Sequence, residues 1–129
     1  MKILIADDHD VVRKGLVAIL RESQAAAVVG EAANGTLAID MALGDDWDAL
    51  ILDISMPGAN GFQVLKTVRL SKPSLPVIML SMHSGAIYVN GAIRAGASGY
   101  LSKETAAEEL LPALRAALSG ETYVSPSIH

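Results

Sequence analysis

Short, nearly unbroken runs of Ile, Leu, Val and Ala alternate along the chain with longer stretches in which apolar residues recur at helical spacing. Such short apolar runs are typical of strands buried on both faces, as in a parallel sheet. The pattern predicts strands at residues 2–6, 27–33, 48–53, 77–81 and 98–101. Each interval between them is long enough for the crossover helix that a parallel pair requires.

The expected helix ends agree with this division. Residues 60–63 and 105–108 have the spacing of a capping box, in which side chains of the first turn satisfy free backbone N–H groups. Gly96 and Gly120 stand where two helices should end, since glycine readily adopts the backbone conformation that closes a helix.

Repeated βα units predict an α/β domain with a doubly wound parallel sheet, and right-handed crossovers leave few strand orders. We favour the order 2-1-3-4-5, with the reversal point between the first and third strands. The 129 residues suit one domain, which we place at residues 1–121. Residues 122–129 have turn residues and no periodicity, and we interpret them as the start of a linker.

Composition narrows the range of functions. The chain has no cysteine, which excludes disulfides, thiolate metal sites and a cysteine nucleophile. Its 10 Lys and Arg against 14 Asp and Glu give a net charge of −4, which argues against a strongly basic nucleic-acid surface. No apolar run approaches the ~18 residues of a membrane span. We therefore expect a soluble, acidic, cytoplasmic domain.

Polar side chains stand at the carboxyl ends of four predicted strands, which is where open α/β sheets bind ligands. They are Asp7 and Asp8 after the first strand, Asp53 at the end of the third, Ser81 at the end of the fourth, and Lys103 after the fifth. Each residue alone could be a helix cap, a loop hydroxyl or a solvated amine. In the favoured strand order they meet at one edge, and this convergence predicts a site.

Three carboxylates at one edge repel one another by about 4 kcal/mol per pair at an effective dielectric constant near 20. Either one of them keeps its proton or a cation lies among them. Carboxylate ligands favour Mg²⁺ or Mn²⁺, whereas His9 and His83 lack a partner at metal-ligand spacing and are interpreted as non-ligands. With Lys103 to neutralise phosphoryl oxygens, Asp53 would attack phosphorus and become an aspartyl phosphate.

Four motifs extend this interpretation: IADDH at residues 5–9, LDISMPG at 52–58, LSM at 80–82 and AGASGYLSK at 95–103. Through them the chain resembles a response-regulator receiver domain over essentially its whole length. The last motif, together with GETYVSP at residues 120–126, is similar to the NarL/FixJ (LuxR-type) subfamily. The resemblance implies a flavodoxin-like (βα)5 receiver fold with the sheet order 2-1-3-4-5.

The resemblance also implies a role for each residue of the predicted site. Asp53 would be the phosphoacceptor, and Lys103 would pair with the phosphoryl group. The Mg²⁺ ligands would be Asp7, Asp8, Asp53 and the backbone carbonyl of Ser55.

Further positions of the family pattern concern the switch and the lifetime of the phosphoryl group. Ser81 would be the switch hydroxyl and Tyr100 the switch aromatic residue. Ser55 and His83 occupy the two positions that tune the lifetime. Glu104 stands where many receivers have a proline, and its presence agrees with the subfamily.

The implied function is a phosphorylation-switched signalling module of a bacterial two-component system in the cytoplasm. A sensor histidine kinase would supply the phosphoryl group, and the domain would catalyse only its own phosphotransfer and dephosphorylation. DNA would be bound, for transcription regulation, only through a C-terminal helix-turn-helix domain that this chain lacks. We also expect a phosphorylation-linked homodimer and no membrane partner.

Two other classes share parts of the pattern. A haloacid-dehalogenase-type phosphatase also uses an aspartate nucleophile with Mg²⁺, but it needs a second aspartate where this chain has Ser55. A flavin-binding module needs a phosphate loop rich in Ser, Thr and Gly after the first strand. This chain has Asp7 and Asp8 there, which repel phosphate.

Overall fold

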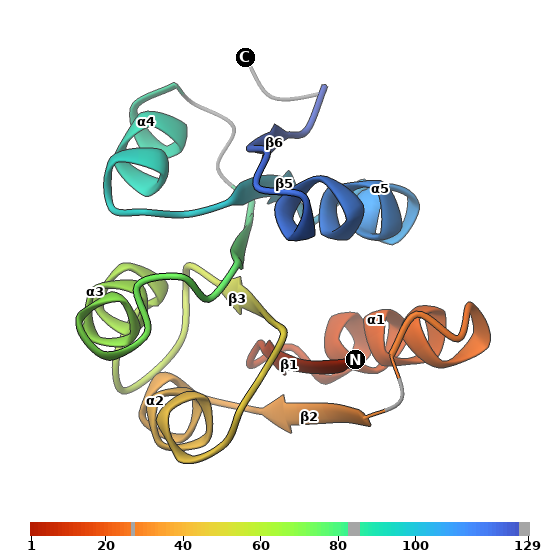
Figure 1. Cartoon of the computed structure of the whole chain (residues 1–129), viewed down its shortest axis with the longest axis horizontal. Coiled ribbons are helices and arrows are strands. Elements are labelled where there is room, and N and C mark those ends of the chain that lie inside the picture. The colour runs from red at the N-terminus through yellow and green to blue at the C-terminus, as the bar shows by residue number, and fades with distance from the viewer. Residues whose placement is uncertain (27, 83–85, 127–129) are drawn as a thin grey trace.

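Helices cover both faces of a central sheet in the computed structural model, which describes residues 1–26, 28–82 and 86–126 (Figure 1). The strands are β1 (Lys2–Ala6), β2 (Val28–Ala32), β3 (Ala49–Asp53), β4 (Val77–Ser81), β5 (Gly99–Ser102) and β6 (Tyr123–Val124). The helices are α1 (Asp10–Glu22), α2 (Gly35–Gly44), α3 (Gly61–Ser71), α4 (Ala86–Arg94) and α5 (Ala106–Leu118). None of these helices is long and apolar enough to span a membrane.

The sheet has the order β2-β1-β3-β4-β5-β6, and all neighbouring strands are parallel. The predicted α/β fold and the order of its first five strands are confirmed. The structure adds β6, a strand of two residues that pairs with Gly99 and Tyr100 of β5. This segment lies within residues 122–129, where we expected a linker. Two residues are too short for a periodic pattern, and the strand is formed by its pairing with the edge strand β5.

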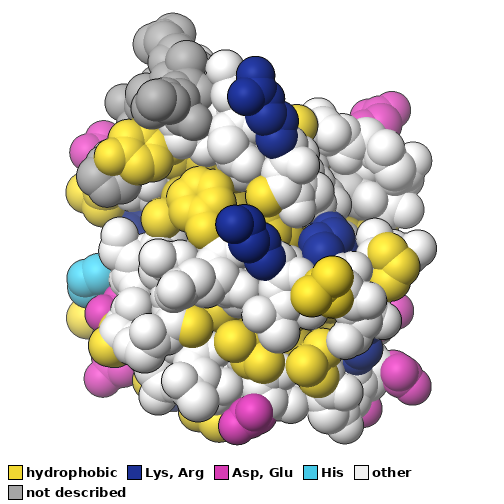
Figure 2. Space-filling model, turned by 90° about the vertical axis from the view of Figure 1, so that its left-hand side faces the viewer, with side chains coloured by type: hydrophobic (Ala, Val, Ile, Leu, Met, Phe, Trp, Pro, Cys, Tyr) yellow, Lys and Arg dark blue, Asp and Glu magenta, His cyan; other side chains and the backbone are white. Residues whose placement is uncertain are grey.

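The core lies in two layers, one on each face of the sheet. The helices α1 and α5 cover one face, and α2, α3 and α4 cover the other (Figure 1). Alternate residues of β3 face opposite layers, with Leu50 and Leu52 on the α2–α3 side and Ile51 on the α1–α5 side. All residues of β3 and β4 are buried, which explains their unbroken apolar sequences. On the α2–α4 side of the molecule, Lys and Arg side chains are interspersed with hydrophobic ones (Figure 2).

The predicted helix ends were confirmed at three of four places. Asn60 caps α3 in a capping box with Gln63, and Gly96 and Gly120 have φ of +101° and +82° after α4 and α5. The predicted capping box at residues 105–108 is wrong, because Thr105 makes no side-chain cap bond. Its φ of −115° and ψ of 5° depart from the extended conformation of a capping residue, and its hydroxyl donates to Glu109 instead.

Candidate functional site

The two central strands bring the acidic residues together. Ala6 of β1 is the register partner of Leu52 of β3, so Asp7 and Asp53 leave the sheet side by side. Asp7 is fully buried and Asp53 is 1% exposed, whereas the Asp8 side chain is 32% exposed. Asp53 is in turn the partner of Leu80 of β4, so Ser81 also lies at this edge.

Lys103 supplies the fixed positive charge of the site. Its Nζ lies 3.2 Å from Asp7 Oδ1 and 3.0 Å from Asp53 Oδ2, and its side chain is only 5% exposed. The Lys103 backbone N–H donates to the carbonyl of Ser81 at 2.9 Å, which ties the residue to the end of β4. Thus Asp7, Asp53 and Lys103, each at least 46 positions from the others in the sequence, meet in one cluster, as the strand order predicted.

The pKa of Asp53 is raised because its carboxylate is buried and Asp7 lies beside it. Burial raises the pKa of Asp53 to about 6, with a further contribution from the charge of Asp7. Lys103 and the backbone N–H of Ser55, which donates to Asp53 Oδ1 at 3.1 Å, oppose the rise but do not cancel it. An added cation would therefore stabilise the ionised form of Asp53.

The donor atoms fit a hard divalent cation. Asp7, Asp8 and Asp53 each offer a carboxylate oxygen, and these atoms lie within 4.8 Å of one another. Asp7 Oδ2 is buried and has no hydrogen-bond partner among the described residues, which is costly unless something else binds it. Oxygen atoms grouped in this way are ligands that suit Mg²⁺ or Mn²⁺.

Comparison with known proteins identifies the family. Residues 3–115 match the model of the response regulator receiver domain. The chain belongs to this family. It is a signalling domain rather than a classical enzyme, which agrees with the interpretation of the sequence.

The relatives place the receiver domain among LuxR-type regulators. The response regulator UvrY of Escherichia coli is 34% identical over 99% of the chain, and the nitrate/nitrite response regulator NarL of the same species is 36% identical over 98%. A two-component response regulator of the LuxR family from Aurantimonas has a TM-score of 0.91, with 31% identity, over 98% of this chain and 91% of that one. The chain spans 59% of UvrY and 58% of NarL.

The remaining predicted residues of the receiver domain lie around this cluster. Ser81 is 2% exposed and Tyr100 is fully buried, and a hydrogen bond joins their side chains. Burial raises the pKa of Tyr100, and that hydrogen bond opposes the rise. Ser55 is exposed in the loop after Asp53, and His83 lies outside the described residues.

Two glycines fix the loop that carries Ser55. A Cβ on Gly61, at the start of α3, would lie 2.4 Å from the carbonyl oxygen of Asp53. A Cβ on Gly35, at the start of α2, would lie 1.7 Å from the carbonyl oxygen of Ala59. Neither distance admits a side chain, so both helices begin in direct contact with this loop.

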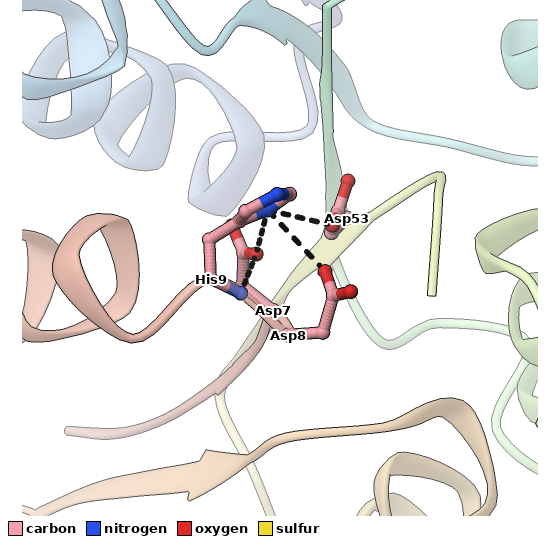
Figure 3. A group of neighbouring side chains, drawn as sticks. All are labelled: Asp7, Asp8, His9 and Asp53. Carbon is pink, nitrogen blue, oxygen red and sulfur yellow. Dashed lines mark hydrogen bonds and ion pairs between the residues drawn. The ribbon is translucent and has the colours of Figure 1, made fainter. Parts of the chain in front are cut away.

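The structure adds two residues that the sequence interpretation did not assign to the site. The His9 ring lies beside the three carboxylates (Figure 3), although we interpreted His9 as a non-ligand because it lacks a partner at metal-ligand spacing in the sequence. Arg13 is 7% exposed, and its Nη1 donates to the carbonyl of Asp7 at 2.6 Å. A detectable signal existed for Arg13, which shares the spacing of Leu16 and Leu20 on the buried face of α1.

The partners of Arg13 explain how it can be buried. Its Nη2 lies 2.6 Å from Asp10 Oδ1 and its Nε lies 3.0 Å from Glu31 Oε1 on β2. Burial lowers the pKa of Arg13, but the hydrogen bonds and charges of these two carboxylates raise it by more. The pKa is therefore raised overall, and the guanidinium stays charged. Arg13 therefore ties the backbone carbonyl of Asp7, at the end of β1, to Glu31 of β2.

Proposed function

We propose that this receiver domain accepts a phosphoryl group on Asp53 from the phosphohistidine of a sensor histidine kinase. The supporting observation is that the buried Asp53 carboxylate lies 3.0 Å from Lys103 Nζ, with the carboxylates of Asp7 and Asp8 beside it. A carboxylate nucleophile, a fixed amine and ligands for a divalent cation are what phosphoryl transfer requires.

The metal ligands in this proposal are Asp7, Asp8, Asp53 and the backbone carbonyl of Ser55. When bound there, Mg²⁺ or Mn²⁺ would offset the negative charge of the phosphoryl oxygens. The buried, unpartnered Asp7 Oδ2 supports this assignment.

The reaction exchanges one bond to phosphorus for another. A carboxylate oxygen of Asp53 forms a bond to phosphorus as the phosphorus–nitrogen bond of the donor imidazole breaks. Lys103 stays beside the phosphoryl oxygens and stabilises their charge, and its action is strong because the site is buried. Dephosphorylation follows when water attacks phosphorus, which yields inorganic phosphate and returns the Asp53 carboxylate.

The response to phosphorylation would pass through Ser81 and Tyr100. A phosphoryl group on Asp53 offers strong acceptors beside the end of β4, and the Ser81 hydroxyl is positioned at that end. If Ser81 turns toward the phosphoryl group, its hydrogen bond to Tyr100 changes. The ends of β4 and β5 would then differ between two states whose populations phosphorylation shifts.

The output belongs to the whole regulator. In our proposal a C-terminal helix-turn-helix domain binds DNA and regulates transcription in the bacterial cytoplasm, with a phosphorylation-linked homodimer as the active form. The LuxR-type relatives, of which this chain spans 58–59%, support this assignment.

The acceptor is tested by intact-mass analysis after incubation with acetyl phosphate and Mg²⁺. We expect one base-labile phosphoryl group on the wild type and none on Asp53→Asn. Asp40→Asn, which changes an exposed aspartate on α2, is the matched control and should be labelled like the wild type. Equal labelling of Asp53→Asn would show that the acceptor lies elsewhere.

The switch is tested by hydrogen exchange with and without beryllofluoride, which mimics the phosphoryl group of aspartyl phosphate. We expect changed protection in β4 and β5 of the wild type and a much smaller change in Ser81→Ala. Both proteins should still bind beryllofluoride. A response of equal size in Ser81→Ala would exclude the hydroxyl as the coupling group.

A further inference from the structure

A partly buried polar cluster holds residues 122–126, which we call the strap, at the edge of the sheet. Within the strap, β6 lies beside β5 and next to α5 (Figure 1). The Tyr123 hydroxyl donates to Glu109 Oε1 at 3.0 Å, and the Ser125 hydroxyl donates to Glu109 Oε2 at 2.6 Å. Because Ser125 is only 1% exposed, its hydroxyl has lost water and depends on this carboxylate for a partner.

The same carboxylate binds the loop that carries Lys103. The Thr105 hydroxyl also donates to Glu109 Oε2, and its oxygen lies 3.4 Å from that of Ser125. Thr105 is two residues after Lys103, whose backbone N–H donates to the carbonyl of Ser81. The Glu109 carboxylate therefore joins the strap to the loop that supplies the lysine of the site.

The backbone of the strap reaches one of the predicted switch residues. The Ser125 N–H donates to the carbonyl of Tyr100 at 2.9 Å, and the Tyr123 N–H donates to that of Ser98 at 3.0 Å. The Tyr100 side chain is in turn hydrogen-bonded to Ser81 at the end of β4. The strap thus has one attachment beside a switch residue and another beside the lysine loop.

A phosphoryl group would disturb the second attachment by its size. Asp53 Oδ2 and Lys103 Nζ are 3.0 Å apart, so a phosphoryl group between them requires the ammonium group to withdraw. The Lys103 side chain is only 5% exposed and closely packed, so part of this movement passes to the backbone of its loop. Thr105 lies in that loop and would move relative to Glu109.

We propose that the strap and Glu109 form a latch that is closed while Asp53 is a free carboxylate and that phosphorylation of Asp53 loosens. In the closed latch, Glu109 accepts hydrogen bonds from all three hydroxyls, which gives this state its stability. The inference rests on the proposed function and deepens it, because the strap would carry the response toward the proposed C-terminal domain.

Coupling of this kind is reciprocal. If a phosphoryl group on Asp53 weakens the latch, then a weakened latch must favour the phosphorylated form by the same factor. The latch can be weakened without changing the proposed metal ligands or phosphoacceptor, because neither Thr105 nor Glu109 is one of them. The two directions of the coupling can therefore be measured separately.

The first experiment examines the latch alone. Hydrogen exchange of the Tyr123 and Ser125 N–H groups is followed by NMR in the wild type, Thr105→Val and Glu109→Gln. Thr105→Val replaces the hydroxyl by a methyl group of similar size. We expect exchange about fivefold faster or more in both variants, and wild-type rates in Glu108→Gln, an exposed neighbour on α5. Equal rates in all four proteins would overturn the latch.

The second experiment measures the coupling with beryllofluoride and Mg²⁺. We expect the Ser125 N–H of the wild type to exchange about fivefold faster or more when beryllofluoride is bound. Thr105→Val should bind beryllofluoride about fivefold more tightly than the wild type, whereas Glu108→Gln should bind it equally well. Equal or weaker binding by Thr105→Val would overturn the coupling.

The outcomes separate the two proposals. A wild type that accepts a phosphoryl group on Asp53 and binds beryllofluoride, but whose strap exchanges at the same rate with and without it, overturns the latch alone. A wild type that accepts no phosphoryl group and binds no beryllofluoride overturns the proposed function, whatever the exchange of the strap in the variants.

Discussion

Two carboxylates of this domain, Asp53 at the end of β3 and Glu109 on α5, have opposite surroundings. Asp53 lies among other carboxylates with one lysine, and burial raises its pKa to about 6. Burial alone would also raise the pKa of Glu109, but hydrogen bonds from Ser125, Thr105 and Tyr123 outweigh it, so the pKa is lowered. The Ser125 and Tyr123 hydroxyls donate at 2.6 and 3.0 Å.

The difference shows how one chemical group serves two purposes. Glu109 has neutral donors that fold with it, so its negative charge is stable and the contacts hold β6 and Ser125 against α5. Asp53 accepts from the backbone N–H of Ser55 and lies beside Lys103, but these partners do not cancel the effect of burial, so its charge is stabilised best by a cation that arrives from solution. A carboxylate whose donors outweigh burial becomes a structural contact, and one whose donors do not becomes a binding and reaction site.

The largest expected effect comes from removing the charge of Asp53. Because its pKa is raised to about 6 from 3.8, its contribution to stability is present below pH 4 and is lost as pH rises through 6. In metal-free protein, Asp53→Asn should therefore raise the free energy of unfolding at pH 8 by up to about 3 kcal/mol, and by much less at pH 4. Urea unfolding in a chelator at both pH values measures this. A variant less stable than the wild type at pH 8 would contradict it.

Glu109 should show the opposite slope. Its lowered pKa means that its contribution to stability is present above the unfolded-state pKa and is lost as pH falls through the folded-state value. Glu109→Gln should cost about 2 kcal/mol at pH 7 and less near pH 3. Glu108→Gln, at the exposed neighbouring position of α5, is the matched control and should have little effect. Equal losses in the two variants would mean that the hydroxyl contacts contribute nothing.

A divalent metal should stabilise the fold through the carboxylates around Asp53 and not through Glu109. At ten times its Kd, Mg²⁺ should raise the free energy of unfolding by about 1.4 kcal/mol. The gain should persist in Glu109→Gln and shrink in Asp8→Asn, which a thermal unfolding series with increasing Mg²⁺ can measure. Stabilisation of equal size in Asp8→Asn would remove this residue from the metal site.

The smallest effect is expected from one donor of Glu109. Tyr123→Phe removes a hydroxyl but keeps the ring, so it should cost about 1 kcal/mol while Ser125 and Thr105 still donate. Hydrogen exchange should show faster exchange of the Ser125 N–H, which donates to the carbonyl of Tyr100. An unchanged exchange rate of this N–H would show that the hydroxyl contacts with Glu109 do not support the pairing of β6 with β5.

The parts of this domain that the sequence predicts are those whose signal lies within one helix or strand or follows from the strand order. The strands β3 and β4 were predictable because both their faces are buried, and Asp53 and Lys103 because parallel strands end at one edge. The capping box at Asn60 is local and was predicted, whereas Thr105 has the same spacing but bonds to Glu109, which in turn binds β6.

The residues that sequence reasoning missed depend on partners that are distant in the chain. His9 meets Asp53 and Lys103, 44 and 94 positions away, and no spacing between neighbours records this. Arg13 can be buried because Glu31 of β2 meets its guanidinium, together with Asp10 and the carbonyl of Asp7. Such pairs are set by how the strands lie against the helices, which only the folded structure shows.

Gly35 and Gly61 predict an unusual map of mutational tolerance. Neither residue has a functional group, yet a methyl group on Gly61 would overlap the backbone carbonyl of Asp53, and one on Gly35 that of Ala59 in the loop after it. In a library of all single substitutions, positions 35 and 61 should lose phosphoryl acceptance almost as completely as position 53. Their exposed or half-exposed neighbours Thr36 and Phe62 should accept many replacements. The most restricted positions would thus mark where backbone meets backbone as well as where the chemistry occurs.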